Sequence, residues 1–157
     1  MSKIIYTQEN GVVAVVHPTD QSLKEMTIEE IAQRVVPVGV TYSIVDDSVI
    51  PTDRSFRNSW VGVGIGSTGG TTITEDMTKA KELHKAKIRE SRVDKFAELD
   101  VEYQRATETS ADTSAIVAKK QALRDAPAAS GIATAVNTTD LKAQWDTSIL
   151  GSNPYYK

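Results

Sequence analysis

Cysteine is absent from this sequence of 157 residues, and aromatic residues are scarce. The absence of cysteine excludes a disulfide framework, a thiolate nucleophile and a zinc site with cysteine ligands. With only two Phe, two Trp and five Tyr, the core has to be built from Ile, Val, Leu and Ala. The length fits one domain, or one small domain with an extended element.

Long hydrophobic runs and a strong net charge are also missing. No stretch of about eighteen apolar residues occurs, and the first residues, MSKIIYTQENG, contain no apolar signal-peptide core. We therefore expect neither export nor a membrane partner. The net charge of −3 is too small to indicate a polyanionic or polycationic partner by itself.

A complete set of catalytic or metal-binding residues is not present either. The two histidines, His17 and His84, are far apart in sequence, and no Gly-x-Ser-x-Gly or His-Glu-x-x-His motif occurs. Neighbouring acids such as Asp46 and Asp47 are typical of turns and helix starts. We predict no catalytic residue, no metal site and no enzymatic activity, and we expect His84 at an ordinary interface or facing solvent.

One glycine motif has the spacing of a dinucleotide-binding loop: Gly64-x-Gly66-x-x-Gly69. That fold needs a second parallel strand after the helix, but here a helix of more than thirty residues is expected and no Val- or Ile-rich strand follows it. A phosphate-binding loop of the nucleotide-hydrolase kind also requires a lysine after its last glycine, and none is present. The sequence therefore predicts no cofactor.

The same glycine-rich stretch has a simpler interpretation as a pliant joint. Residues 62–70 contain five glycines, which adopt many backbone conformations. Thr71, Thr72 or Thr74 is expected to cap the long helix behind it. We assign residues 51–73 to an aromatic and arginine-containing segment followed by this joint.

Residues 1–50 are predicted to form a small ββαβ module. Asn10-Gly11 can supply the two positive-φ residues of a type I′ turn between apolar strands. Thr27 and Glu30 have the spacing of a capping box, which predicts a helix from about residue 28 to 35. A further strand is expected near residues 42–45.

The rest of the chain is predicted to be helical. No Gly or Pro occurs between Thr74 and Glu108, so one helix of about nine turns and on the order of 50 Å is possible. A second helix, from about Thr113 to Asp125, would make residues 74–126 an antiparallel hairpin. Residues 127–157 are expected to form a linker, a short helix with Leu141 and Trp145 one turn apart, and an irregular tail. The fold class is thus α+β.

Two charged or aromatic segments are candidates for partner binding. Residues 79–95 carry seven Lys or Arg against three acids. A solvated helical face is the commonest explanation for such a run. The alternatives are that the run docks on an acidic protein surface or on a nucleic-acid backbone. The run lacks aromatic residues that would stack on bases, which favours a protein partner.

The second candidate is the stretch DRSFRNSW, in which Phe56 and Trp60 lie four residues apart between arginines. Aromatic and arginine side chains supply much of the energy at protein contacts. Phe56 and Trp60 could equally pack a helical turn against the sheet, and both interpretations can hold together. We assign the following residues to a candidate partner surface: Arg54, Phe56, Arg57, Trp60, Lys81, Lys85, Arg89, Arg92 and Trp145.

The order of several blocks resembles a group of bacteriophage proteins. The blocks are IPTDRSFRNSW, DMTKAKELHKAKIRESR, FAELD, KQALRDAP and TTDLKAQW, and they cover about residues 50–146. They are similar to small proteins that tailed bacteriophages, particularly of marine and cyanobacterial hosts, encode among their virion and tail genes. The charged helix with its LRD ending is also similar to phage tail assembly chaperones.

The resemblance implies a non-enzymatic virion component that binds other virion proteins. A small apolar core and a helix longer than that core favour stability through association, so we expect a homo-oligomer or several symmetric copies. The resemblance also implies a location in the host cytoplasm during assembly and then in the virion. Two alternatives remain: a transient tail or tail-fibre assembly chaperone, and a nucleic-acid-binding accessory that uses the basic run from Lys79 to Lys95.

Overall fold

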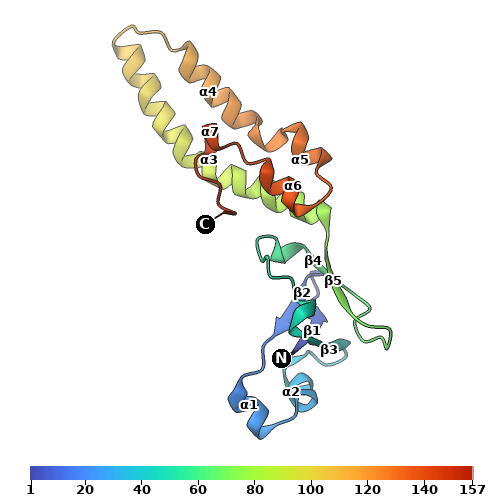
Figure 1. The fold of residues 1–157 in the computed structure, drawn as a ribbon. Coiled ribbons are helices and arrows are strands. Elements are labelled where there is room, and N and C mark those ends of the chain that lie inside the picture. Colours follow the sequence, from blue (N-terminus) through green and yellow to red (C-terminus); the bar gives the residue numbers. More distant parts are fainter. Residues whose placement is uncertain (157) are drawn as a thin grey trace. The chain divides into compact units, whose positions relative to one another are not determined.

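The structure is a computed structural model that describes residues 1–156. The chain forms two compact units, the first ending at Asp76 and the second beginning at Met77. The first contains antiparallel strands with short helices, and the second is built from helices (Figure 1). The predicted α+β class is therefore confirmed.

The first unit is organised around a three-stranded antiparallel sheet. Its strands are β1 (Ser2–Thr7), β2 (Val13–Val16) and β3 (Tyr42–Asp46), in the order β2-β1-β3. The central strand β1 pairs with both neighbours, so that Ile4 lies opposite a residue of β2 and a residue of β3. The predicted hairpin and third strand are present, but the expected type I′ turn was wrong: the Gly11 amide donates to the Gln8 carbonyl, and of Asn10 and Gly11 only Gly11 has a positive φ.

Two helices separate β2 from β3. Helix α2 (Ile28–Val35) begins at Thr27, and the predicted capping box with Glu30 is formed. Helix α1 (Asp20–Glu25) was not expected. It is capped by Thr19, whose hydroxyl accepts a hydrogen bond from the Ser22 amide, and it buries none of its residues. A helix without a buried face has no apolar periodicity from which it could be predicted.

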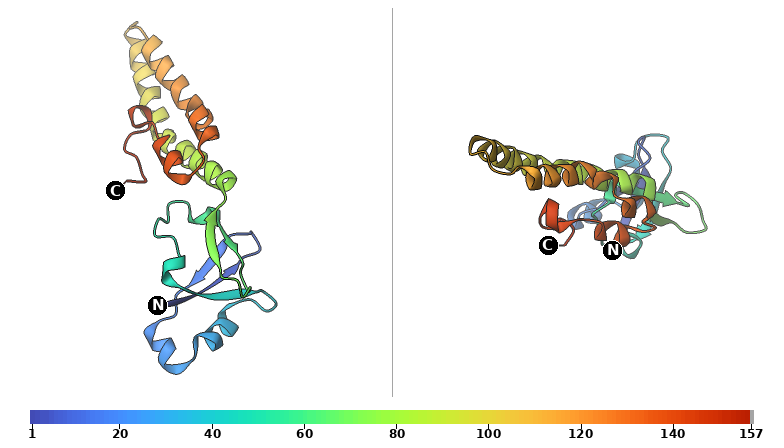
Figure 2. Two further views of the ribbon diagram at one scale, coloured as in Figure 1. Left: turned by 45° about the vertical axis from the view of Figure 1, so that its right-hand side comes forward. Right: turned by 90° about the horizontal axis from the view of Figure 1, so that it is seen from above.

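The sheet has a hydrophobic cluster on each face, because successive residues of a strand point to opposite sides. Ile4 packs with Ile31 and Ala32 of α2. Its neighbour Ile5 packs on the other side with Val13 and Trp60. Trp60 begins a second hairpin, formed by β4 (Trp60–Val63) and β5 (Thr72–Glu75). The first unit therefore has a helix layer, a sheet and a hairpin layer (Figure 2).

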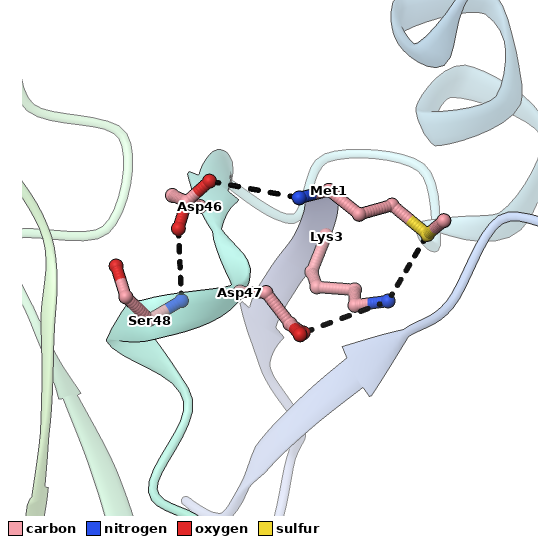
Figure 3. Close-up of polar contacts among 5 residues, drawn as sticks. All are labelled: Met1, Lys3, Asp46, Asp47 and Ser48. Carbon is pink, nitrogen blue, oxygen red and sulfur yellow. Dashed lines mark hydrogen bonds and ion pairs between the residues drawn. The ribbon is translucent and has the colours of Figure 1, made fainter.

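Polar contacts fasten the start of β1 to the end of β3 (Figure 3). The N-terminal amine of Met1 lies 3.7 Å from Asp46, and Nζ of Lys3 lies 3.6 Å from Asp47. The Ser48 amide donates to Asp46 at 3.0 Å. Hydrogen bonds from the Ser48 backbone and side chain hold the pKa of Asp46 below its ordinary value.

The second unit is dominated by α3 (Met77–Glu108), which is continuous over 32 residues. Helix α4 (Ser114–Asp125) runs back along it, so the predicted antiparallel hairpin is formed (Figure 1). Lys120 joins the two helices, since its Nζ lies 2.6 Å from Asp100 and 4.7 Å from the ring centroid of Tyr103.

Among residues 1–156, no helix combines the length and apolar character needed to cross a membrane.

Three short helices follow α4 and a 3-10 turn at Ala126–Ala128: α5 (Ser130–Thr134), α6 (Thr138–Ala143) and α7 (Thr147–Leu150). Seen from above, α6 and α7 lie on the same side of the hairpin (Figure 2).

The expectation of a linker after α4 was wrong in part. Ile132 of α5 is buried, and a side chain at Gly131 would collide with Gln144. Helix α6 matches the predicted short helix and is capped by Asn137. The start of the expected irregular tail, Ile149 and Leu150, belongs to α7.

Candidate functional site

The aromatic residues of DRSFRNSW lie in the core of the first unit. Phe56 and Trp60 are 1% and 0% exposed, and a 3-10 turn at Arg57–Ser59 connects them. The Arg54 guanidinium lies 5.6 Å from the centroid of the Trp60 ring. The two aromatic side chains therefore stabilise the fold and offer no surface to a partner. Of the four residues assigned here, the two arginines, Arg54 and Arg57, are exposed.

The glycine-rich segment is the loop of the β4–β5 hairpin and not a joint. Strand β5 follows it, so Thr72 and Thr74 lie in a strand and α3 begins only at Met77. The loop is fixed to β3, because Ser43 accepts a hydrogen bond from the Gly66 amide at 2.7 Å and contacts the Thr71 hydroxyl at 2.8 Å. No helix N-terminus follows the loop, and a dinucleotide-binding loop depends on one.

Part of the basic run on α3 is occupied by contacts within the second unit. Lys81 donates to the carbonyl of Ala133 at 2.6 Å. Lys85 forms an ion pair of 2.8 Å with Glu82. Arg89 is exposed.

Arg92 has a distinct structural role at the end of α4. Its guanidinium donates to the carbonyls of Leu123 and Arg124 at 3.1 and 3.2 Å. These carbonyls belong to the last turn of α4, where backbone acceptors lack helical partners and the helix dipole is negative. Arg92 therefore caps a neighbouring helix, a contact that its place in a charged run does not reveal.

His84 is fully buried on α3, so of its two expected positions, at an interface or facing solvent, the solvent-facing one was wrong. Its ring stacks on Tyr155 with centroids 5.6 Å apart, and the centroid of the Trp145 ring lies 6.2 Å away in an edge-to-face arrangement. Desolvation by burial lowers the pKa of His84 to about 4 and raises that of Tyr155. Trp145 is 5% exposed and donates to the Gly151 carbonyl, so it too belongs to the core.

The face of α3 that points away from this core carries a second row of apolar residues. We call it the outer stripe, and it consists of Leu83, Ala86, Val93, Ala97 and Val101. Val93 and Val101 are 62% and 48% exposed. Val101 follows the buried Leu99 by two residues, which is about 200° around a helix. The stripe extends over about 27 Å at a rise of 1.5 Å per residue.

Sequence reasoning missed the outer stripe, although a signal was present. Its members follow one another at spacings of three, four and seven residues, which place them on one helical face. The candidate partner surface on this helix was assigned instead to the basic residues Lys81, Lys85, Arg89 and Arg92. A helix with two apolar rows on opposite sides can bury one in its own unit and present the other.

The charges of α3 are divided along its length. Six Lys or Arg and two Glu occur from Met77 to Arg92, whereas two Lys or Arg and five acids occur from Val93 to Glu108. Val93, in the outer stripe, therefore lies at the boundary between a basic half and an acidic half.

Nothing in the described residues 1–156 gathers three or more His, Asp or Glu side chains in a way that could hold a metal ion. No protein-family model, curated protein or solved structure matches the chain.

Proposed function

We propose that this protein is a non-enzymatic bacteriophage structural protein that binds other virion proteins through the outer stripe of α3. The observation that carries the proposal is the aligned exposure of Val93 and Val101 on a helix whose opposite face already packs on its own unit. Single exposed apolar residues are common, but a row along one helical face is typical of helix-to-protein contacts.

The resemblance of residues 50–146 to phage virion and tail-associated proteins supports the biological setting of this proposal. We propose the host cytoplasm during assembly, and afterwards the particle, as the location of the protein. The contact surface differs from the sequence-based assignment, because Phe56, Trp60 and Trp145 are core residues. Arg89 remains an exposed cation of the basic half, beside the stripe.

Nucleic-acid binding through the basic run is less well supported. Lys81 and Arg92 donate to backbone carbonyls, so fewer cations are available for phosphates. A nucleic-acid-binding protein would also lose affinity steeply as the salt concentration rises. Retention of DNA at low salt, with that dependence, would favour this alternative.

Quantitative mass spectrometry of purified phage particles tests the proposal. We expect the protein in particles at a fixed copy number. Val93→Asp should lower its incorporation, whereas Val136→Asp, a change at another exposed valine of the second unit, should not. If the protein is absent from particles but is held by a tail or fibre protein in infected cells, it is an assembly chaperone. Absence from both would contradict the proposal.

A further inference from the structure

We infer that the outer stripe pairs with the outer stripe of a second copy of this chain, in an antiparallel arrangement centred near Val93. This inference rests on the proposed function, and it names a second copy of this chain as the virion protein that the outer stripe binds. It rests on two observations about α3 that are independent of each other: the exposed apolar row and the division of charge.

The charge division selects the direction of pairing. In a parallel pair the basic half of α3 would lie beside the basic half of the other copy, and the acidic halves would also meet. In an antiparallel pair each basic half, Met77–Arg92, lies beside an acidic half, Val93–Glu108. Lys81, Lys85 and Arg92 keep their contacts within their own unit. The exposed Arg89 faces the acidic half of the other copy. Like charges in register destabilise helix pairs and opposite charges stabilise them, so the antiparallel direction is favoured.

The same division selects the register. The two halves overlap fully when the two-fold axis passes near the middle of the helix, close to Val93. A two-fold interface uses the same residues from both copies. Val93 then contacts Val93 of the other copy near the axis, and Ala86 of one copy approaches Val101 of the other.

Three point variants test the apolar contact by sedimentation velocity. The wild-type protein should dimerise with increasing concentration. Val93→Asp and Val93→Lys each place two like charges near the axis, and each should raise the dimer dissociation constant about tenfold or more. A mixture of the two variants pairs opposite charges and should restore dimers. Val136→Asp is the matched control and should dimerise like the wild type.

Cysteine cross-linking tests direction and register, and the chain offers a clean background because it has no cysteine. Val93→Cys should form a disulfide-linked dimer under oxidising conditions. Ala86→Cys should cross-link with Val101→Cys when the two proteins are mixed. Ala86→Cys alone and Val101→Cys alone should not form disulfide-linked dimers. In the antiparallel pair, the two copies of each of these positions lie about 20 Å or more apart, whereas a disulfide joins Cα atoms less than about 7 Å apart.

The outcomes separate this inference from the proposed function. Self-cross-linking of Ala86→Cys and of Val101→Cys would indicate a parallel pair and overturn the inference. A protein that stays monomeric at millimolar concentration, with no disulfide at Val93→Cys, would also overturn it. If that monomeric protein still enters particles and Val93→Asp blocks its entry, the proposed function stands with a different partner.

Discussion

Nδ1 of His84 lies 2.8 Å from the hydroxyl oxygen of Tyr155, although 71 residues separate the two along the chain. The stacked rings and the edge of Trp145 form one aromatic cluster on the inner face of α3. This contact holds the C-terminal segment against the helix. The inner face of α3 is thus occupied by its own chain, whereas Val93 and Val101 of the outer stripe are exposed.

Two substitutions of Tyr155 should therefore destabilise the second unit to different extents. Tyr155→Phe removes the hydrogen bond to His84 and should lower the free energy of unfolding by about 1–2 kcal/mol. Tyr155→Ala also removes the stacked ring and should cost about 2–4 kcal/mol. Urea unfolding followed by circular dichroism at 222 nm measures both. Equal effects for the two variants would contradict the role of the stacked ring.

The buried His84 should make stability depend on pH. Its pKa falls from 6.5 to about 4 on folding, so the unfolded chain binds more protons between these values. Stability should therefore be complete above pH 6.5 and fall as the pH is lowered to about 4, by at most about 3 kcal/mol. Urea unfolding from pH 7.5 to 4.5 measures this dependence.

His84→Gln provides the control for the pH dependence. The variant should be less stable than the wild type at pH 7.5, because it loses the stacked ring. Its stability should nevertheless change less between pH 6.5 and 5, where the carboxylates with lowered pKa values, such as Asp112 and Asp146, stay ionised. An unchanged slope would show that His84 is not the titrating group.

Two arginines of α3 should differ in their importance for stability. Arg92→Ala removes the cap on the last turn of α4 and should cost about 1–2 kcal/mol. Arg89→Ala changes an exposed residue on the same helix and should stay within about 0.5 kcal/mol of the wild type. Thermal unfolding of both variants gives the comparison, and equal losses would contradict the capping role.

Two glycines of the β4–β5 loop should respond differently to alanine. Gly66 has φ of 78°, and an added Cβ would lie 2.0 Å from Cγ2 of Thr41. Gly69 lacks a positive φ, and its nearest neighbour would be 4.0 Å away. We expect Gly66→Ala to cost about 1–3 kcal/mol and Gly69→Ala to be nearly neutral. Similar melting temperatures for the two variants would contradict a fixed loop.

Local signals in the sequence account for much of the fold. The capping box of Thr27 and Glu30 specifies the start of α2, and Asn10-Gly11 marks the position of a turn although not its type. The absence of Gly and Pro from α3 likewise specifies a continuous helix, over a longer stretch of the chain. These features depend on backbone preferences and on short-range hydrogen bonds, so one sequence is enough to find them.

The remaining features depend on contacts between distant residues. The glycine-rich segment is the loop between the paired strands β4 and β5 and bonds to Ser43 of β3, and no local pattern encodes the contact with Ser43. Tyr155 lies in a stretch of Gly, Asn and Pro but stacks on His84. Phe56 and Trp60 have the composition of a contact surface and yet fill the core. Composition alone does not separate a buried aromatic residue from a binding one.

Site-specific photo-cross-linking in assembled particles tests whether the outer stripe is the binding surface. A photoreactive amino acid is placed at Val93 in the outer stripe or at Val136 as the control, and cross-linked peptides are identified after irradiation. We expect position 93 to cross-link to a virion protein or to a second copy of this chain, and position 136 to cross-link far less. Equal cross-linking at the two positions, or none at position 93, would contradict the assignment of the outer stripe as the binding surface.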